Sequence, residues 1–238
     1  DIAVYQPSLG RWSIMGITNI YYGTRNDTPI VGDFDNDGTS DLGIFRPDTG
    51  FWSIRNITAC IFGVESDSPV TGDYDGDGCC DIAIFRNARS LWAIKGITRM
   101  YYGAYNDMPA AGYYKGGPIK YVAVFRSDSG LWAIRDLSRI YFGKARDQPL
   151  QNDFNGDGTW DVGVFGLDNG LWSLRAISRV YFGKLGDLPI QGDFNGDGTF
   201  DIGIFRNYAA CWMLKGLSNV YFGKNVDIPV TGGRAQIP

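Results

Sequence analysis

One pattern of apolar and polar positions recurs six times along the chain, once every 40 residues. Within a unit, three short apolar segments, such as 81–86, 91–95 and 97–102, are separated by polar residues and glycine, and a fourth begins at a proline, as at 69–74. These segments are rich in β-branched and aromatic side chains, which is typical of strands. A tryptophan marks the same place in every unit: Trp12, Trp52, Trp92, Trp132, Trp172 and Trp212.

Four strands per unit predict one antiparallel blade. The fixed period predicts a propeller or a solenoid, because units of this kind bury their apolar faces only against their neighbours. The segment 82–85 is apolar on both faces, as expected for a blade that lies between two others. The strand that begins at the proline is the shortest and contains a glycine, which favours the crowded position beside the propeller axis.

The two chain ends indicate a closed ring. Residues 1–23 begin at the second strand of a blade, and residues 229–233 supply its missing first strand. An open solenoid would need polar end units to protect its edges, and these ends are as apolar as the middle of the chain. We therefore predict an all-β fold. A single domain over residues 1–238 forms a six-bladed β-propeller with four antiparallel strands per blade, closed by the C-terminal strand.

Four junctions between units carry an acidic loop. In the first copy, Asp33, Asp35 and Asp37 alternate, Gly38 follows, and Asp41 closes the loop. Side chains at alternate positions of a tight turn converge on one point, and the glycine permits the positive φ that the turn needs. Calcium takes six to eight oxygen ligands, so the carbonyl at the seventh loop position is expected to join the carboxylates. The alternative, Asp-Gly turns without a metal, is disfavoured by the recurrence of this spacing in four loops.

The four loops predict four calcium ions, each acting as a structural staple between the first two strands of a blade. The expected ligands are Asp33, Asp35, Asp37, Thr39 and Asp41, then Asp73, Asp75, Asp77, Cys79 and Asp81, then Asp153, Asn155, Asp157, Thr159 and Asp161, and finally Asp193, Asn195, Asp197, Thr199 and Asp201. The third junction carries Tyr113, Lys115, Gly117 and Tyr121 instead, and the closing junction at 231–238 also lacks ligands. The Lys115 ammonium is a candidate substitute for the missing ion.

These motifs resemble the FG-GAP/VCBS repeat family, whose calcium-loop propellers include the integrin α-subunit head. The order of the segment 141–149 followed by the loop 153–158 carries the resemblance, which covers the whole chain. It implies that the calcium loops link the first two strands of each blade and face one end of the ring. Related seven-bladed propellers include sugar-binding lectins. Six blades depart from that number, so the ligand sites of those proteins do not transfer.

Composition narrows the functional classes. The net charge of −4 would become +4 with four calcium ions, and no basic cluster with interleaved aromatics predicts nucleic-acid binding. No apolar run reaches the roughly 18 residues of a membrane span. The chain has no histidine, which removes the commonest general base and argues against an enzyme. The cysteines are expected as free thiols, with a disulfide as the alternative: Cys60, Cys79, Cys80 and Cys211.

The end of the ring opposite the acidic loops is the candidate binding face. There, an aromatic ring near arginine would suit a sugar, by stacking and by charged hydrogen bonds. The candidate ligand residues are Trp52, Trp92, Trp132, Trp172, Arg46, Arg86, Arg126 and Arg206. The alternative is that the tryptophans pack between blades and that the arginines pair with the repeated aspartates. Less regular candidates for specificity are Tyr105, Tyr208, Lys144, Lys184 and Lys224.

The expected function is that of a non-enzymatic, calcium-stabilised propeller that binds carbohydrate at several weak sites, as a lectin does. The alternative is a protein-interaction or structural module of a larger extracellular or surface protein. An enzyme is a third reading, and no unique carboxylate pair or nucleophile–base set supports it. Loops of this kind fill at the millimolar calcium found outside cells, so a secreted or cell-surface location is expected.

Overall fold

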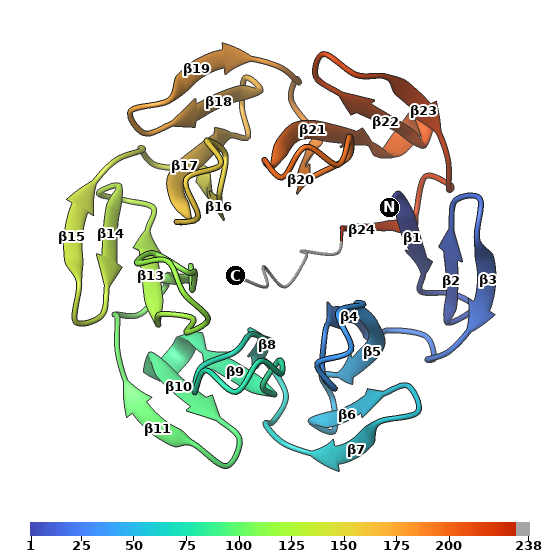
Figure 1. Ribbon diagram of the computed structural model, residues 1–238, viewed down its shortest axis with the longest axis vertical. Helices are drawn as coiled ribbons and strands as arrows, with labels where there is room; N and C mark the ends of the chain where they lie inside the picture. The colour runs from blue at the N-terminus through green and yellow to red at the C-terminus, as the bar shows by residue number, and fades with distance from the viewer. Residues whose placement is uncertain (232–238) are drawn as a thin grey trace.

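Residues 1–231 are described by a computed structural model of the chain. They form six four-stranded antiparallel sheets, which stand as blades around one axis (Figure 1). The chain builds each blade from its innermost strand outward, and the first blade receives its innermost strand from the end of the described chain. The predicted six-bladed all-β propeller is confirmed. No helix within these residues is long and apolar enough to cross a membrane.

The strands occupy four positions in the blades. The innermost strands are β24 (Ile228–Val230), β4 (Thr28–Gly32), β8 (Ser68–Pro69), β12 (Met108–Pro109), β16 (Asp147–Asn152) and β20 (Leu188–Gly192). The second strands are β1 (Ala3–Gln6), β5 (Asp41–Arg46), β9 (Ala83–Arg86), β13 (Ala123–Arg126), β17 (Asp161–Gly166) and β21 (Asp201–Arg206). The third strands are β2 (Arg11–Ile14), β6 (Phe51–Ile54), β10 (Leu91–Ile94), β14 (Leu131–Ile134), β18 (Leu171–Leu174) and β22 (Cys211–Leu214). The outer strands are β3 (Thr18–Tyr21), β7 (Thr58–Ile61), β11 (Thr98–Tyr101), β15 (Ser138–Tyr141), β19 (Ser178–Tyr181) and β23 (Asn219–Tyr221).

Two short 3-10 helices, η1 (Asn87–Arg89) and η2 (Asn207–Ala209), precede third strands. The expectation that the innermost strand is the shortest holds for β8 and β12, with two residues each, and for β24, with three. It is wrong for β4 and β20, with five residues each, and for β16, with six. In the blade of β8 the regular pairing stops before Gly72, which makes an isolated bridge to Asp81. In the blade of β16 the pairing continues without a break to the acidic loop.

Ring closure follows the prediction. β24 pairs with β1, with Val230 opposite Ala3 and Pro229 opposite Val4. Val4 also packs in the core cluster of the preceding blade, beside Trp212. The ring is therefore closed by hydrogen bonds within the first blade and by apolar packing against the last one. Positions 232 and 233 of the predicted closing strand, and most of the closing junction, lie outside the described residues.

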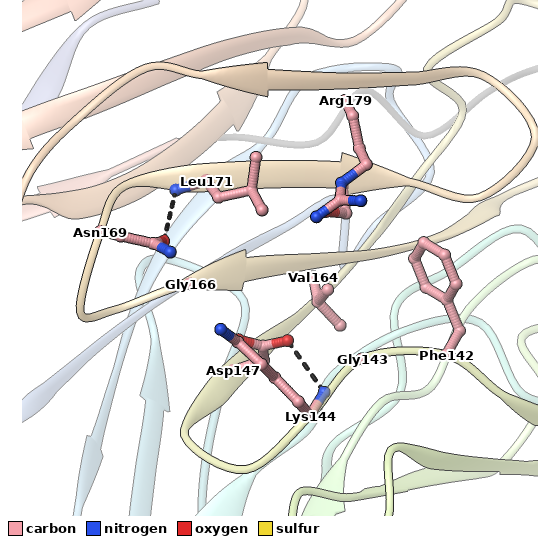
Figure 2. Close-up of a pocket in the computed structure, with 10 residues that line it drawn as sticks. Phe142, Gly143, Lys144, Asp147, Val164, Gly166, Asn169, Leu171 and Arg179 are labelled. Atoms are coloured by element: carbon pink, nitrogen blue, oxygen red, sulfur yellow. Dashed lines mark hydrogen bonds between the residues drawn. The ribbon is translucent and has the colours of Figure 1, made fainter.

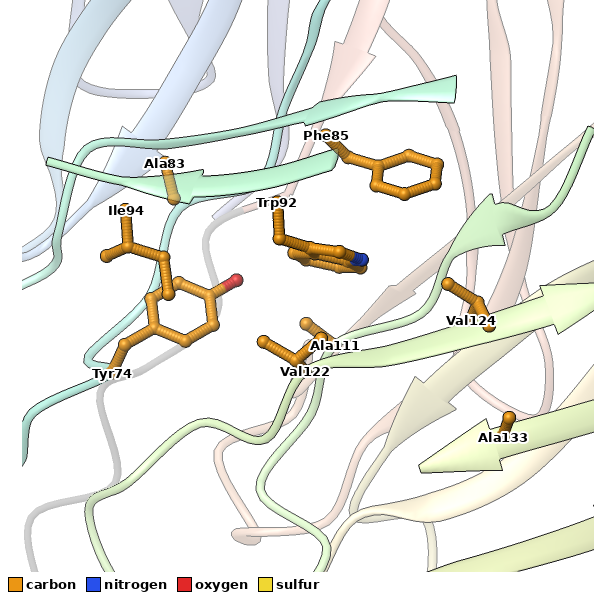
Figure 3. Close-up of a cluster of buried hydrophobic side chains, with 9 residues drawn as sticks. All are labelled: Tyr74, Ala83, Phe85, Trp92, Ile94, Ala111, Val122, Val124 and Ala133. Carbon is orange, nitrogen blue, oxygen red and sulfur yellow. The ribbon is translucent and has the colours of Figure 1, made fainter. Parts of the chain in front are cut away.

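The tryptophans form the contact between successive blades. All six are 0% exposed. Trp92 lies between Phe85 of its own blade and Val122 and Val124 of the next one, as Figure 3 shows, with the Phe85 and Trp92 ring centroids 4.9 Å apart. Its indole nitrogen donates a hydrogen bond to the carbonyl oxygen of Tyr102 at 3.2 Å. The same bond recurs in every blade, so each tryptophan ties its strand to the segment that follows the outer strand.

Neighbouring blades are also joined through the acidic loops. The backbone N–H of Cys80 donates to the carbonyl oxygen of Asp33 at 2.6 Å, and that of Phe200 donates to the carbonyl oxygen of Asp153 at 2.9 Å. The backbone N–H groups of Lys120 and Trp160 make the equivalent bonds to the carbonyl oxygens of Asp73 and Tyr113, so four of the junctions are joined to the junction of the preceding blade.

The third junction replaces acidic ligands with a lysine between aromatic rings. The Lys120 ammonium donates to the carbonyl oxygen of Thr71 at 2.7 Å and lies 5.4 Å from the ring centroid of Trp160 and 5.8 Å from that of Tyr113. Lys115, the expected substitute for the ion, is exposed and has no hydrogen bond or ion pair within residues 1–231. Lys120 supplies the positive charge here instead. Desolvation of its ammonium lowers the pKa of Lys120 to about 8.

The buried ammonium predicts a pH-dependent stability difference. The folded pKa of Lys120 lies below the unfolded value of about 10.4, so above about pH 8 the unfolded state holds more protons and stability rises with pH. Relative to Lys120→Met, the free energy of unfolding of the wild type should rise by up to about 1.4 kcal/mol per pH unit above pH 8. Urea denaturation of both proteins at pH 7 and pH 9 measures this. A difference that is the same at both pH values would contradict it.

Candidate functional site

The four acidic loops lie at one end of the ring, each between the innermost and second strands of a blade. In the loop between β4 and β5, Asp33 Oδ2 accepts the backbone N–H of Gly38 at 2.9 Å, and Asp41 Oδ2 accepts that of Phe34 at 2.8 Å. Gly38 has the expected positive φ, at 84°. These bonds turn the loop on itself, so its carboxylates point toward a common centre.

The carboxylates meet in the two loops that carry only aspartate. Oxygens of Asp33, Asp35 and Asp37 lie within 4.8 Å of one another, and so do oxygens of Asp73, Asp75 and Asp81. The structure therefore brings together three of the predicted side-chain ligands in each of these loops, although in the second loop Asp81 takes the place of Asp77 in the cluster.

In the two other loops an amide nitrogen stands between carboxylates. The Asn155 side-chain nitrogen donates to Asp157 at 3.1 Å and to Asp161 at 3.4 Å. Asn195 makes the same pair of contacts at 3.0 Å and 3.5 Å. A donor placed between two carboxylates marks a point of negative potential. Turning the amide over would present its oxygen to a cation at that point.

Electrostatics in the loops favour a bound cation. Desolvation is the main cause that raises the pKa of Asp81 to about 6, and the neighbouring carboxylates of Asp75, Asp73 and Asp77 add to it. Desolvation also raises the pKa of Asp41, Asp161 and Asp201. Like charges at short range disfavour ionisation, and a divalent ion would remove that penalty. The donor set consists of oxygens alone, which fits calcium.

The opposite end of the ring carries a repeated ion pair. Arg46, Arg86, Arg126 and Arg206, at the ends of the second strands, pair with an aspartate that precedes the innermost strand. Each guanidinium donates two bonds: Nε to Oδ1 at 2.7 to 2.9 Å, and a terminal nitrogen to Oδ2 at 2.8 to 3.0 Å. The partner aspartates are Asp27, Asp67, Asp107 and Asp187.

This geometry favours the structural reading of the predicted ligand residues. The faces of Trp52, Trp92, Trp132 and Trp172 are covered on both sides by core residues, so they offer no surface on which a sugar could stack. Two nitrogens of each of the four arginines, Nε and one terminal nitrogen, donate to a buried carboxylate. Among the less regular candidates, Tyr105 and Tyr208 are exposed, and Lys184 lies 5.2 Å from the ring centroid of Tyr208.

Two blades keep the aspartate and lack the arginine. In the first blade Gln6 stands in its place, and Asp227 Oδ1, Gln6 Oε1 and Arg11 Nε are buried without a hydrogen-bond partner within residues 1–231. In the blade of β16 to β19 the arginine is replaced by Gly166, and a pocket of about 260 Å³ opens there.

The pocket at Gly166 is lined by Asp147, Lys144, Asn169 and Arg179, with apolar walls that include Phe142 (Figure 2). Lys144 is a predicted specificity candidate, whereas the pocket was not predicted from the sequence. The signal was present, because aligning the units places Gly166 where four others have arginine. Only the structure shows that the side chain of Asn169 occupies the start of this space and leaves the rest open as a pocket.

Comparisons with known proteins bear on the fold. No protein-family model and no curated protein sequence matches the chain. The fold resembles a chain from a crystal structure of BBS1N in complex with ARL6DN, soaked with mercury, with a TM-score of 0.50 and 11% sequence identity. The match covers 82% of this chain and 68% of that one. At this identity the likeness shows the propeller fold alone.

Breaking one ion pair should destabilise the ring. Arg126→Ala leaves Asp107 buried without its counter-ion, and we expect a loss of about 3 kcal/mol, at the low end for a buried pair because Arg126 keeps 35% side-chain exposure. The double variant Arg126→Ala with Asp107→Asn should recover part of the loss. Chemical denaturation measures both. Unchanged stability in the single variant would show that the pair is not structural.

Proposed function

We propose that the chain is a non-enzymatic binding module, a propeller whose ring is stabilised by calcium in the four acidic loops and whose opposite end receives a protein partner. The observation that carries the calcium part is the convergence of three carboxylates in each all-aspartate loop. The proposed ligands are the loop residues predicted above. The FG-GAP/VCBS assignment and a secreted or cell-surface location belong to the same proposal.

Calcium would act on the inner part of each blade. It would tie the innermost strand to the second strand. The backbone hydrogen bonds between successive loops would then stabilise the contact between neighbouring blades as well. A site at a hundredfold excess of calcium over its dissociation constant contributes about 2.7 kcal/mol. The loops with asparagine should bind less tightly, because each has one carboxylate fewer.

A protein partner is favoured over a glycan. The tryptophans that would stack on a sugar are buried, and the repeated arginines are already paired. Two hollows of about 260 Å³ and 700 Å³ share Asp147 at the end opposite the acidic loops. This end therefore offers a concave surface to a partner. The similar fold of BBS1N is found in complex with ARL6DN, an example of a propeller bound to a protein.

The calcium part is tested by thermal melting with calcium and with excess chelator. At about 2–4 °C per kcal/mol, calcium should raise the melting temperature by at least about 10 °C. Magnesium should do less, because it demands a tighter octahedral shell. The control Asp33→Asn with Asp35→Asn and Asp37→Asn should lower the calcium stoichiometry from four to three. Equal melting temperatures with calcium and with chelator would overturn the proposal that calcium stabilises the ring.

The partner class is tested by presenting the calcium-loaded chain to a glycan array and to a random-peptide library. The proposal expects a blank array, together with synthetic library peptides that bind saturably in calorimetry. A defined glycan hit with no binding peptide would overturn the protein partner and support the lectin hypothesis.

A further inference from the structure

Four blades show what the buried aspartate at this end of the ring binds. In each, a guanidinium donates two nearly parallel hydrogen bonds to both carboxylate oxygens, as Arg126 does to Asp107 at 2.8 and 3.0 Å. A planar guanidinium matches a carboxylate in this two-bond arrangement, which an ammonium cannot reproduce. Each of these aspartates is thus a binding site for a guanidinium. In four blades an arginine of the chain itself occupies that site.

The blade of β16 to β19 keeps that site without its guanidinium. Asp147 is 6% exposed, and its Oδ2 accepts the backbone N–H of Lys144 at 2.9 Å, as the equivalent aspartates do. Its Oδ1, the oxygen that takes the arginine Nε elsewhere, has no donor within residues 1–231. Burial raises the pKa of Asp147. A buried carboxylate without its charge partner is costly, so binding a cation there is favourable.

The space for the missing group is present. The pocket of about 260 Å³ lies where an arginine on β17 would extend from position 166, and Figure 2 shows Asp147 and Gly166 lining it. The arginines in the other blades keep 20 to 35% side-chain exposure, so the equivalent position in this blade is accessible from solvent. Lys144 and Arg179 also line the pocket, and neither has a side-chain nitrogen within 4.0 Å of an Asp147 carboxylate oxygen.

We propose that the pocket at Gly166 binds the guanidinium group of an arginine side chain of a partner protein, with Asp147 as its counter-ion. The proposal deepens the proposed function, on which it rests for the partner being a protein. The neighbouring hollow of about 700 Å³ also contains Asp147, and it adds the amide side chains of Gln148, Gln151 and Gln191 and the ion pair between Arg146 and Asp168 at 3.8 Å. These groups suit the backbone and flanking residues of an arginine-bearing segment.

The experiment uses ethylguanidinium as the probe, followed by amide chemical shifts in the calcium-loaded chain. We expect saturable shifts at Gly166, Asn169 and Lys144. The neutral isostere ethylurea should bind at least about tenfold more weakly, because hydrogen bonds to a charged group contribute about 1.5–3 kcal/mol. Ethylammonium should also bind more weakly, since it offers no parallel pair of donors. Absence of saturable shifts, or equal binding of ethylurea, would overturn the proposal.

Two variants remove the site in different ways. Asp147→Asn removes the counter-ion and should weaken ethylguanidinium binding at least about tenfold. Gly166→Arg with Asn169→Ser should abolish binding and raise the melting temperature, because it copies Arg126 and Ser129 of the preceding blade. The second change is needed because a Cβ at position 166 would lie 2.5 Å from Asn169 Oδ1. Binding that survives in both variants would show that the probe sits elsewhere.

The converse variant is the matched control. Arg126→Gly with Ser129→Asn should open a second ethylguanidinium site beside Asp107, and failure to do so in a folded protein would count against the proposal. These readouts need neither a partner nor a calcium effect. A chain that calcium does not stabilise but that binds the probe at Asp147 would overturn the calcium part of the proposed function and leave this inference standing.

Discussion

Each blade buries one aspartate carboxylate away from water at the same end of the ring. The ion pairs at that end follow from this burial. The six aspartates at or just before the start of the innermost strands are buried, and each accepts the backbone N–H of the residue three positions earlier. That bond fixes the turn that brings the chain from the outer edge of one blade to the axis of the next. The cost of the buried charge must then be met by a counter-ion. Four arginines on the second strands meet it.

The other end of the ring also holds carboxylates at close range, here in the acidic loops. The acidic loops crowd carboxylates that no basic side chain within residues 1–231 pairs with, although in two loops the amide of Asn155 or Asn195 donates a hydrogen bond to them. Lys120 shows a third solution at the junction without acidic ligands, where an ammonium lies among a carbonyl and two rings. Between the two ends, the tryptophans pack blade on blade and leave little freedom in the ring. The fold is therefore uniform in its core, and its blades differ in how charge is compensated.

The period of 40 residues predicts the fold well, because a repeated tryptophan and repeated apolar strands leave few ways to bury both faces of every unit. Ring closure by β24 follows from the same register. Strand lengths could not be read in the same way, since Gly32 and Gly192 end unbroken strands at the repeat position where Gly72 and Gly112 form isolated bridges. The sequence also placed Lys115, rather than Lys120, at the third junction, because spacing alone does not show which side chain points inward.

The site was predicted in part. The spacing of the acidic loops gives the carboxylates that converge, and the alternative of an Asp–Arg ion pair was visible from the repeat. The pocket beside Asp147 was not predicted, although Gly166 breaks the repeat, because an absent side chain reveals a cavity only when its neighbours are known not to fill it.

The most direct measurement is a carbon-detected NMR titration of the Asp147 carboxyl group in the wild type and in the Gly166→Arg, Asn169→Ser variant. Burial without a counter-ion predicts a pKa for Asp147 above the usual aspartate value in the wild type, and a lower one once the arginine is present. An ordinary pKa in the wild type, or a pKa that the added arginine leaves unchanged, would contradict the claim that a guanidinium is what this buried carboxylate lacks.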